Sequence, residues 1–153
     1  KNIFFLKTVS ITLGWFFFFL FLCAAISGTI SPLDVIIASF YSLLSFAGSA
    51  IMDIRDFEGD KKAGLRTIPI VLGLNETASM LFGIGILQYL IVIVFSFFSA
   101  ESLPYLALLL TFPTRIMIYL GITRGKYHRM YNSSILSYPL ATLSLLIAKL
   151  WPI

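Results

Sequence analysis

Three aspartates stand at regular intervals where a long apolar stretch of the chain ends. Asp53, Asp56 and Asp60 are spaced i, i+3 and i+7, so a helix continued through them would carry all three carboxylates on one face. Such a row is repulsive unless a cation lies against it, and hard divalent cations prefer carboxylate oxygens. Because Mg²⁺ is commonly held by one or two carboxylates together with substrate phosphates, the row predicts a Mg²⁺-bridged phosphate or pyrophosphate.

Basic residues are interspersed with these acids. Arg55, Lys61, Lys62 and Arg66 lie close enough in sequence to contact phosphate oxygens, Arg through its forked guanidinium and Lys as a point charge. A simpler interpretation also fits, because the four acids and four bases between positions 53 and 66 would balance one another in a solvated loop. The residues by themselves leave both interpretations open.

The rest of the chain is strongly apolar. Of its 153 residues, 59% are hydrophobic and 12% are charged, whereas soluble domains are about 45–50% apolar and about 25% charged. Five segments approach the roughly 20 residues that a helix needs to cross a bilayer. They are residues 8–27, 33–52, 77–100, 103–123 and 134–150. The sequence therefore predicts an all-α integral membrane protein with five transmembrane helices in one domain.

Basic residues alternate between the predicted loops. Lys1 and Lys7 precede the first span, the charged loop 53–66 follows the second, and the three bases of residues 124–129 follow the fourth, while the loops after the first and third have none. Since cytoplasmic loops are enriched in Lys and Arg, this predicts a cytoplasmic N-terminus, charged loop and 124–129 loop. The net charge of +4 is then explained by membrane orientation, and no nucleic-acid partner is expected.

The stretch "DIRDFEGDKKAGLRTIPIVLG" closely resembles the second aspartate-rich motif of UbiA-type intramembrane prenyltransferases. In that superfamily D-x-x-D-x-x-x-D is followed by a basic residue, a Gly, an Arg or Lys with Thr or Ser, an apolar-Pro pair and a Leu-Gly. The matching positions here are Asp53, Asp56, Asp60, Lys61, Gly64, Arg66, Thr67, Pro69, Leu72 and Gly73. The "E-G-D" form is more similar to the branches acting on homogentisate, naphthoate, tetrapyrrole or archaeal glycerol-lipid acceptors than to the hydroxybenzoate branch.

This resemblance implies a bundle of nine transmembrane helices with two aspartate-rich motifs facing each other at the cytoplasmic mouth of a central cavity. The five spans here would be helices five to nine, so residues 1–153 would form the C-terminal part, about half of the bundle, of a single prenyltransferase domain. The first motif, N-x-x-x-D-x-x-x-D, has no match in the chain. We therefore expect a piece of a longer protein, with the missing N-terminal helices as its partner, that is inactive alone.

The resemblance also implies a reaction. Asp56 and Asp60, with Asp53 supporting, would hold Mg²⁺ on a prenyl pyrophosphate whose tail lies in the apolar cavity. Lys7, Lys61 and Arg66 would contact the pyrophosphate, and the segment "FFLK" is similar to the basic entry to helix five, although Ile3 stands where many members have Tyr. A lipid-soluble aromatic or hydroxyl acceptor would then attack the allylic carbon, as in quinone or lipid biosynthesis.

Arg115 lies about two turns inside the fourth predicted span. Ionisable residues at such depth are functional candidates, so Arg115 is predicted to bind the substrate pyrophosphate or, alternatively, to form a structural ion pair or an interface anchor. Pro113, two residues earlier, is expected to kink this helix. The alternative function for the whole protein is a membrane transporter or a non-catalytic membrane subunit. Transporters commonly carry charges near the midplane, whereas the acids here cluster at one surface, which favours the enzyme.

Overall fold

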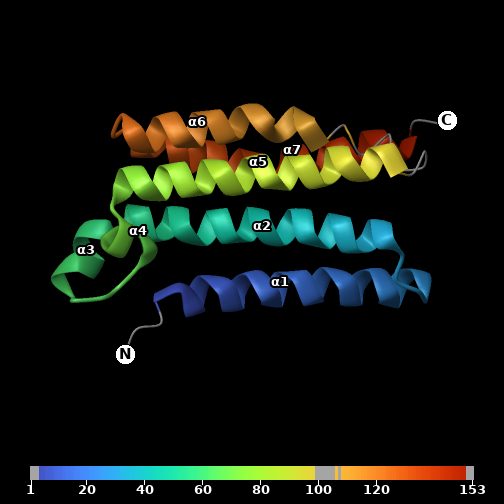
Figure 1. Ribbon diagram of the computed structural model, residues 1–153, viewed down its shortest axis with the longest axis horizontal. Helices are drawn as coiled ribbons and strands as arrows, with labels where there is room; N and C mark the ends of the chain where they lie inside the picture. Colours follow the sequence, from blue (N-terminus) through green and yellow to red (C-terminus); the bar gives the residue numbers. More distant parts are fainter. Residues whose placement is uncertain (1–3, 99–105, 107, 151–153) are drawn as a thin grey trace. The chain divides into compact units, whose positions relative to one another are not determined.

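The computed structural model describes residues 4–98, 106 and 108–150. Seven α-helices follow one another along the described part of the chain (Figure 1). They are α1 (Phe4–Ser27), α2 (Pro32–Arg55), α3 (Phe57–Lys62), α4 (Ile68–Leu72), α5 (Leu74–Phe98), α6 (Phe112–Thr123) and α7 (Tyr127–Leu150). The chain divides into two compact units, Lys1–Met80 and Leu81–Ile153, which we describe one at a time.

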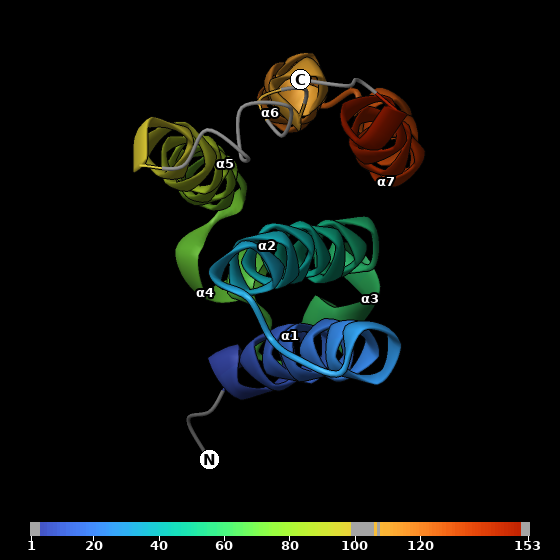
Figure 2. The same ribbon diagram turned by 90° about the vertical axis from the view of Figure 1, so that its right-hand side faces the viewer.

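The first unit is a hairpin of α1 and α2 with the short helices α3 and α4 at the end where α2 finishes (Figures 1 and 2). Gly28, at a φ of 74°, ends α1 in a left-handed conformation that costs glycine little. Ser31 then caps α2: its hydroxyl accepts from the backbone N–H of Asp34, and the Asp34 carboxylate accepts from the N–H of Ser31. This capping box fixes where α2 begins.

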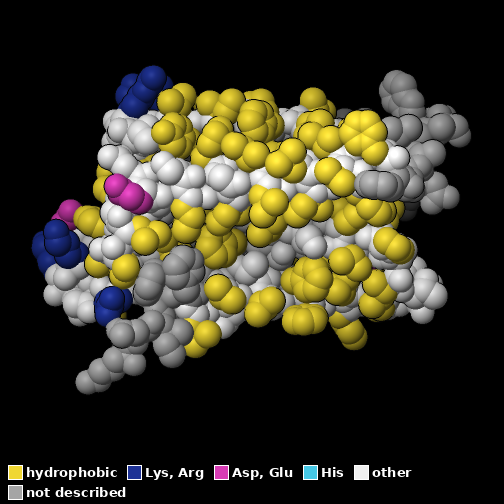
Figure 3. All heavy atoms as spheres, in the orientation of Figure 1, with side chains coloured by type: hydrophobic (Ala, Val, Ile, Leu, Met, Phe, Trp, Pro, Cys, Tyr) yellow, Lys and Arg dark blue, Asp and Glu magenta, His cyan; other side chains and the backbone are white. Residues whose placement is uncertain are grey.

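Apolar side chains cover the face of this hairpin that Figure 3 shows, and the charged side chains of the hairpin visible there lie at the end that carries α3. On α1 the large side chains of Trp15, Phe17 and Phe21 are exposed, as expected of rings that meet lipid. One ring of that run turns inward, since Phe19 lies 4.9 Å from Tyr41 between ring centroids. The small residues of α2, such as Ala47 and Ala50, are buried, which lets neighbouring helices approach closely.

The second unit contains most of α5 together with α6 and α7. α6 begins at Phe112 with Pro113 in its first turn. Residues 108–111 form a 3₁₀ turn that leads directly into α6, so Pro113 lies beside a change of helix type, and the predicted kink stays a prediction. A proline is tolerated there because the N–H it lacks would have no intrahelical acceptor at a helix start. α7 begins at Tyr127, seven residues before the predicted start of the last span, and contains Pro139 within it.

Three of the five predicted spans are confirmed as helices long and apolar enough to cross a membrane: Leu6–Ser27, Pro32–Arg55 and Leu74–Phe97. The region of the fourth contains a shorter apolar helix, Leu108–Thr123, and part of the predicted segment lies outside the described residues. The all-α class is thus confirmed for the described residues, while five crossings and a half-bundle stay predictions.

Candidate functional site

The aspartate row lies where α2 ends and α3 begins. The backbone keeps helical hydrogen bonds across this point, with the N–H of Asp56 donating to the carbonyl of Met52 at 3.0 Å and that of Asp60 donating to Asp56 at 2.9 Å. At Asp56 itself, φ is −91° and ψ is 7°, and the residue is a turn between the two helices. The single helix expected through all three aspartates is therefore interrupted at the middle one, although their spacing of about one turn is preserved.

Asp53 is joined to α1 by an ion pair. The Nζ of Lys7 donates to the Asp53 carboxylate at 2.9 Å, across 46 positions of sequence. The Asp53 side chain is 5% exposed and that of Lys7 is 63% exposed, so a buried acid is neutralised by a base that reaches it from the surface. Lys7 also lies within electrostatic range of Asp60 and Asp56. Its ammonium therefore neutralises Asp53 directly and adds positive charge near the other two carboxylates of the row.

Asp56 has a different partner. The guanidinium of Arg55 donates from Nε and Nη2 to the two oxygens of Asp56 at 2.8 and 3.0 Å, and both side chains are about half exposed. These hydrogen bonds hold the pKa of Asp56 below its ordinary value. The carboxylate consequently stays ionised, as a metal ligand must, to a lower pH than an unpaired aspartate would.

Other predicted contacts for pyrophosphate lie along α3 and the segment after it. Asp60 is partly exposed on α3, and Lys61 and Arg66 are exposed. The Nζ of Lys61 lies 5.8 Å from the centre of the Phe57 ring, a cation–π distance. Both bases are therefore accessible to an anion from outside the protein.

The residues fit a magnesium–pyrophosphate complex in donor chemistry. No group of three His, Cys, Asp or Glu side chains among the described residues is already arranged to hold a metal ion. Mg²⁺ does not need one, because it takes one or two carboxylates and completes its shell with phosphate oxygens and water.

The hydroxyls of Thr8 and Thr67 are buried without a partner among the described residues, and each directly follows a predicted pyrophosphate contact, Lys7 or Arg66. These are donors that an anionic ligand could satisfy.

Arg115 belongs to the second unit. Its Nη2 donates to the Oε1 of Gln88 on α5 at 2.7 Å, both residues are almost fully buried, and the Nε of Arg115 has no partner among the described residues. Gly85, one turn before Gln88, leaves room for this side chain, since a Cβ there would lie 3.4 Å from the Cγ of Arg115. Among the described residues, the contact that Arg115 makes is with this neutral amide, and its role in binding pyrophosphate stays a prediction.

Sequence reasoning missed Gln88 and Thr8. Gln88 is an uncharged polar residue in the middle of an apolar run, which is the signal that could have found it, because such a group needs a partner inside a membrane bundle. Thr8 gave no comparable signal, since Thr is common at helix surfaces of every kind.

Comparisons with known proteins agree with the motif. Residues 1–148 match the UbiA prenyltransferase family. The chain is 29% identical over 129 residues to the chloroplastic chlorophyll synthase of Oryza sativa subsp. japonica, covering 82% of this chain and 34% of that protein. It is 31% identical over 105 residues to the digeranylgeranylglyceryl phosphate synthase of Haloquadratum walsbyi, covering 68% of this chain and 36% of that protein.

A shorter match, 43% identical over 56 residues, joins the chain to the digeranylgeranylglyceryl phosphate synthase of Halobacterium salinarum and covers 36% of this chain and 19% of that protein. No solved structure matches the chain. In the two longer matches the chain spans about a third of the length of the curated relatives.

Proposed function

Because the chain belongs to the UbiA prenyltransferase family, we propose that it carries one pyrophosphate-binding half of an intramembrane prenyltransferase site. The whole protein would transfer a prenyl group from a prenyl pyrophosphate to a lipid-soluble aromatic or hydroxyl acceptor, and this chain alone would be inactive. The observation that carries the proposal is the Lys7–Asp53 pair. It joins a base of α1 to the acidic end of α2, at the head of a row that continues with Asp56 and Asp60.

In this proposal Asp56 and Asp60, with Asp53 supporting, hold Mg²⁺. When bound, the ion would neutralise charge on the pyrophosphate and orient it. Asp56 is kept ionised by Arg55, so it is ready as an oxygen ligand at neutral pH. Asp53 keeps Lys7 beside the row, and the exposed Nζ can turn toward a phosphate oxygen without leaving the site.

The bases stabilise the leaving group. As the bond between the allylic carbon and the pyrophosphate oxygen breaks, negative charge grows on that oxygen, and Lys7, Lys61 and Arg66 are proposed to share it. Arg115 is proposed to contact the same anion through its unpartnered Nε. The segment 53–66 is proposed to lie on the cytoplasmic side, on the basis of the basic loops.

The test is pyrophosphate release by the intact parent protein, measured with and without Mg²⁺ for several prenyl lengths. We expect Mg²⁺-dependent release to fall about 100-fold or more in Asp56→Asn and Asp60→Asn, the loss typical of removing a major electrostatic stabiliser. Glu58→Gln is the matched control, because Glu58 is an exposed acid of α3 outside the row. Equal activity in all three variants would refute the site and favour a transporter or a non-catalytic subunit.

A further inference from the structure

The connection between α6 and α7 concentrates positive charge. Arg124, Lys126 and Arg129 stand within six residues, and the sequence contains no Asp or Glu after Glu101. All three side chains are exposed, and within the part of the chain that the structure describes none of them forms an ion pair. Like charges gathered this closely in the sequence repel one another, so an anion bound among them would stabilise the arrangement.

The backbone holds these bases together. A Cβ on Gly121 would lie 2.8 Å from the Cβ of Met130 and 2.9 Å from its nitrogen, so α6 and α7 meet there at a distance that only glycine allows. Gly125 turns the chain at a φ of 64°, and the N–H of Lys126 donates to the carbonyl of Gly121 at 2.7 Å. The tight turn therefore fixes the three bases around one small space.

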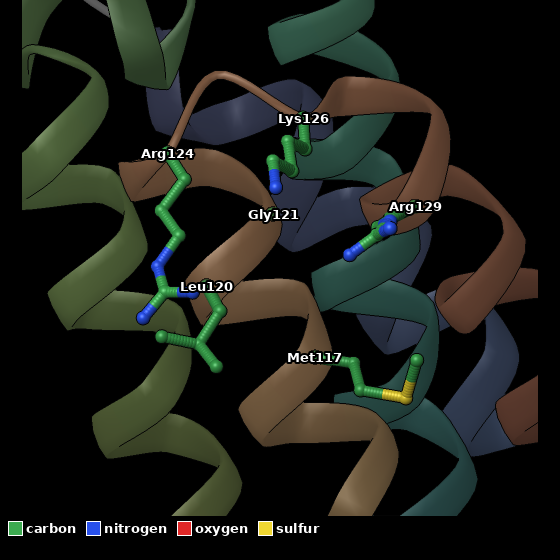
Figure 4. Close-up of a pocket in the computed structure, with 6 residues that line it drawn as sticks. All are labelled: Met117, Leu120, Gly121, Arg124, Lys126 and Arg129. Atoms are coloured by element: carbon green, nitrogen blue, oxygen red, sulfur yellow. The ribbon is translucent and has the colours of Figure 1, made fainter.

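That space is a pocket with two kinds of lining. The bases line one part and Met117, Leu120 and Gly121 line the other, around a cavity of about 90 Å³. Figure 4 shows Lys126 and Arg129 extending over the face of α6 that carries Gly121 and Met117, with Arg124 beside Leu120. Lys126 and Arg129 also flank the start of the 24-residue helix α7, whose N-terminal dipole favours an anion at the same place.

We propose that this pocket binds the phosphate of an anionic membrane lipid, with an acyl chain against Met117 and Leu120. Met117 is 49% exposed, so it offers a surface for a hydrocarbon chain directly below the bases. A soluble phosphate would use the basic part of the lining and leave this apolar part unused. The lining of this pocket contains no carboxylate to hold a metal, and its residues are not those of the aspartate row.

The experiment titrates the full-length parent protein in detergent with phosphatidylglycerol, and counts bound lipid by native mass spectrometry. Arg129→Gln is expected to weaken binding about fivefold, the effect of one base near an anionic lipid, and the triple Gln variant of the three bases far more. Arg129→Lys should retain most of the affinity, which also reports that the fold is intact. Lys62→Gln is the matched control, since it removes one exposed base of α3 outside the pocket.

Two competition arms separate the sources of phosphate. Phosphatidylcholine, whose phosphate is offset by its choline, should compete weakly, and inorganic phosphate at the same concentration should not displace the lipid. Displacement by inorganic phosphate would overturn the proposal in favour of a free-anion site. Equal weakening by Arg129→Gln and Lys62→Gln, or no phosphatidylglycerol binding at all, would overturn it in favour of diffuse surface charge.

Discussion

The connection after α2 and the connection after α6 both gather charge beside apolar helices, but they hold it differently. After α2, acids and bases are mixed, and Asp53 and Asp56 are engaged by Lys7 and Arg55. After α6, three bases stand together without an acid, and the close approach of Gly121 to Met130 holds the turn. Ion pairs stabilise the first connection, and close packing of two helices stabilises the second.

This difference indicates what each connection can bind. Carboxylates already paired with bases can exchange those partners for a metal and a phosphate with little change in net charge. Uncompensated bases can bind an anion directly, with no metal. The contrast makes four further predictions, all for the intact parent protein, and all unfolding measurements are made in one detergent.

The largest effect is expected from breaking the ion pair between Lys7 and Asp53. Lys7→Met leaves the buried Asp53 carboxylate without its base, and we expect a loss of about 2 kcal/mol in the free energy of unfolding. This is less than the 3–5 kcal/mol of a fully buried pair, because Lys7 is largely exposed. Thermal unfolding followed by tryptophan fluorescence measures it.

The double variant Lys7→Met/Asp53→Leu provides the control, because it removes both charges at once. It should recover most of the free energy of unfolding. Pyrophosphate release, which we expect Lys7→Met to lower because Lys7 is a proposed pyrophosphate contact, should not recover. Recovery of activity together with stability would mean that the pair is purely structural.

Disturbing the close packing of Gly121 against Met130 should destabilise the protein nearly as much. Gly121→Ala places a methyl group against Met130 and must push α6 away from α7, at a cost of about 1–3 kcal/mol. Gly83→Ala is the matched control, since Gly83 is exposed on α5 and a Cβ there meets nothing within 4 Å. If both variants unfold at the same temperature, the close approach does not stabilise the turn.

A smaller loss is expected at the buried amide of the second unit. Gln88→Leu removes the oxygen that accepts from Arg115 and should cost about 1–2 kcal/mol, the price of one unsatisfied buried donor. The double variant Gln88→Leu/Arg115→Leu should be more stable than Gln88→Leu alone, because the buried guanidinium that lost its acceptor is then removed as well. A thermal unfolding cycle of the two singles and the double checks this, and strict additivity would contradict it.

The smallest effect concerns the exposed pair beside the turn. Arg55→Gln should raise the pKa of Asp56 toward its ordinary value, because the guanidinium that lowers it is gone. A lowered pKa means that the pair stabilises the fold fully at neutral pH and loses that contribution as pH falls through the folded-state pKa. The acid limb of Mg²⁺-dependent pyrophosphate release should therefore move to higher pH in the variant, while release at neutral pH changes little.

Much of this architecture could be predicted from the order of residues. The length of the apolar runs located α1, α2 and α5 to within a few residues, and the aspartate spacing located the acidic end of α2. The break at Asp56 was not predictable, since neither Gly nor Pro marks it. The early start of α7 was missed because its first turns are polar and its hydropathy is low, although polar residues at a membrane surface are compatible with helix.

The sequence predicts which residues belong to the candidate site, but not which of them contact one another. That Lys7 belongs with the aspartates followed from a family resemblance, but its choice of Asp53 over Asp56 depends on how α1 packs on α2. The Gln88–Arg115 contact depends on the same kind of packing between α5 and α6, which local sequence does not encode.

The pairing of Lys7 with Asp53 also bears on how the protein is made. Lys7 is synthesised with α1, and the carboxylate that neutralises it arrives only when α2 is nearly complete. Each charge is costly near hydrocarbon while it is alone. The pair therefore favours insertion of α1 and α2 into the bilayer together, as one hairpin. A change at either residue should lower the efficiency of membrane insertion before it affects the folded protein.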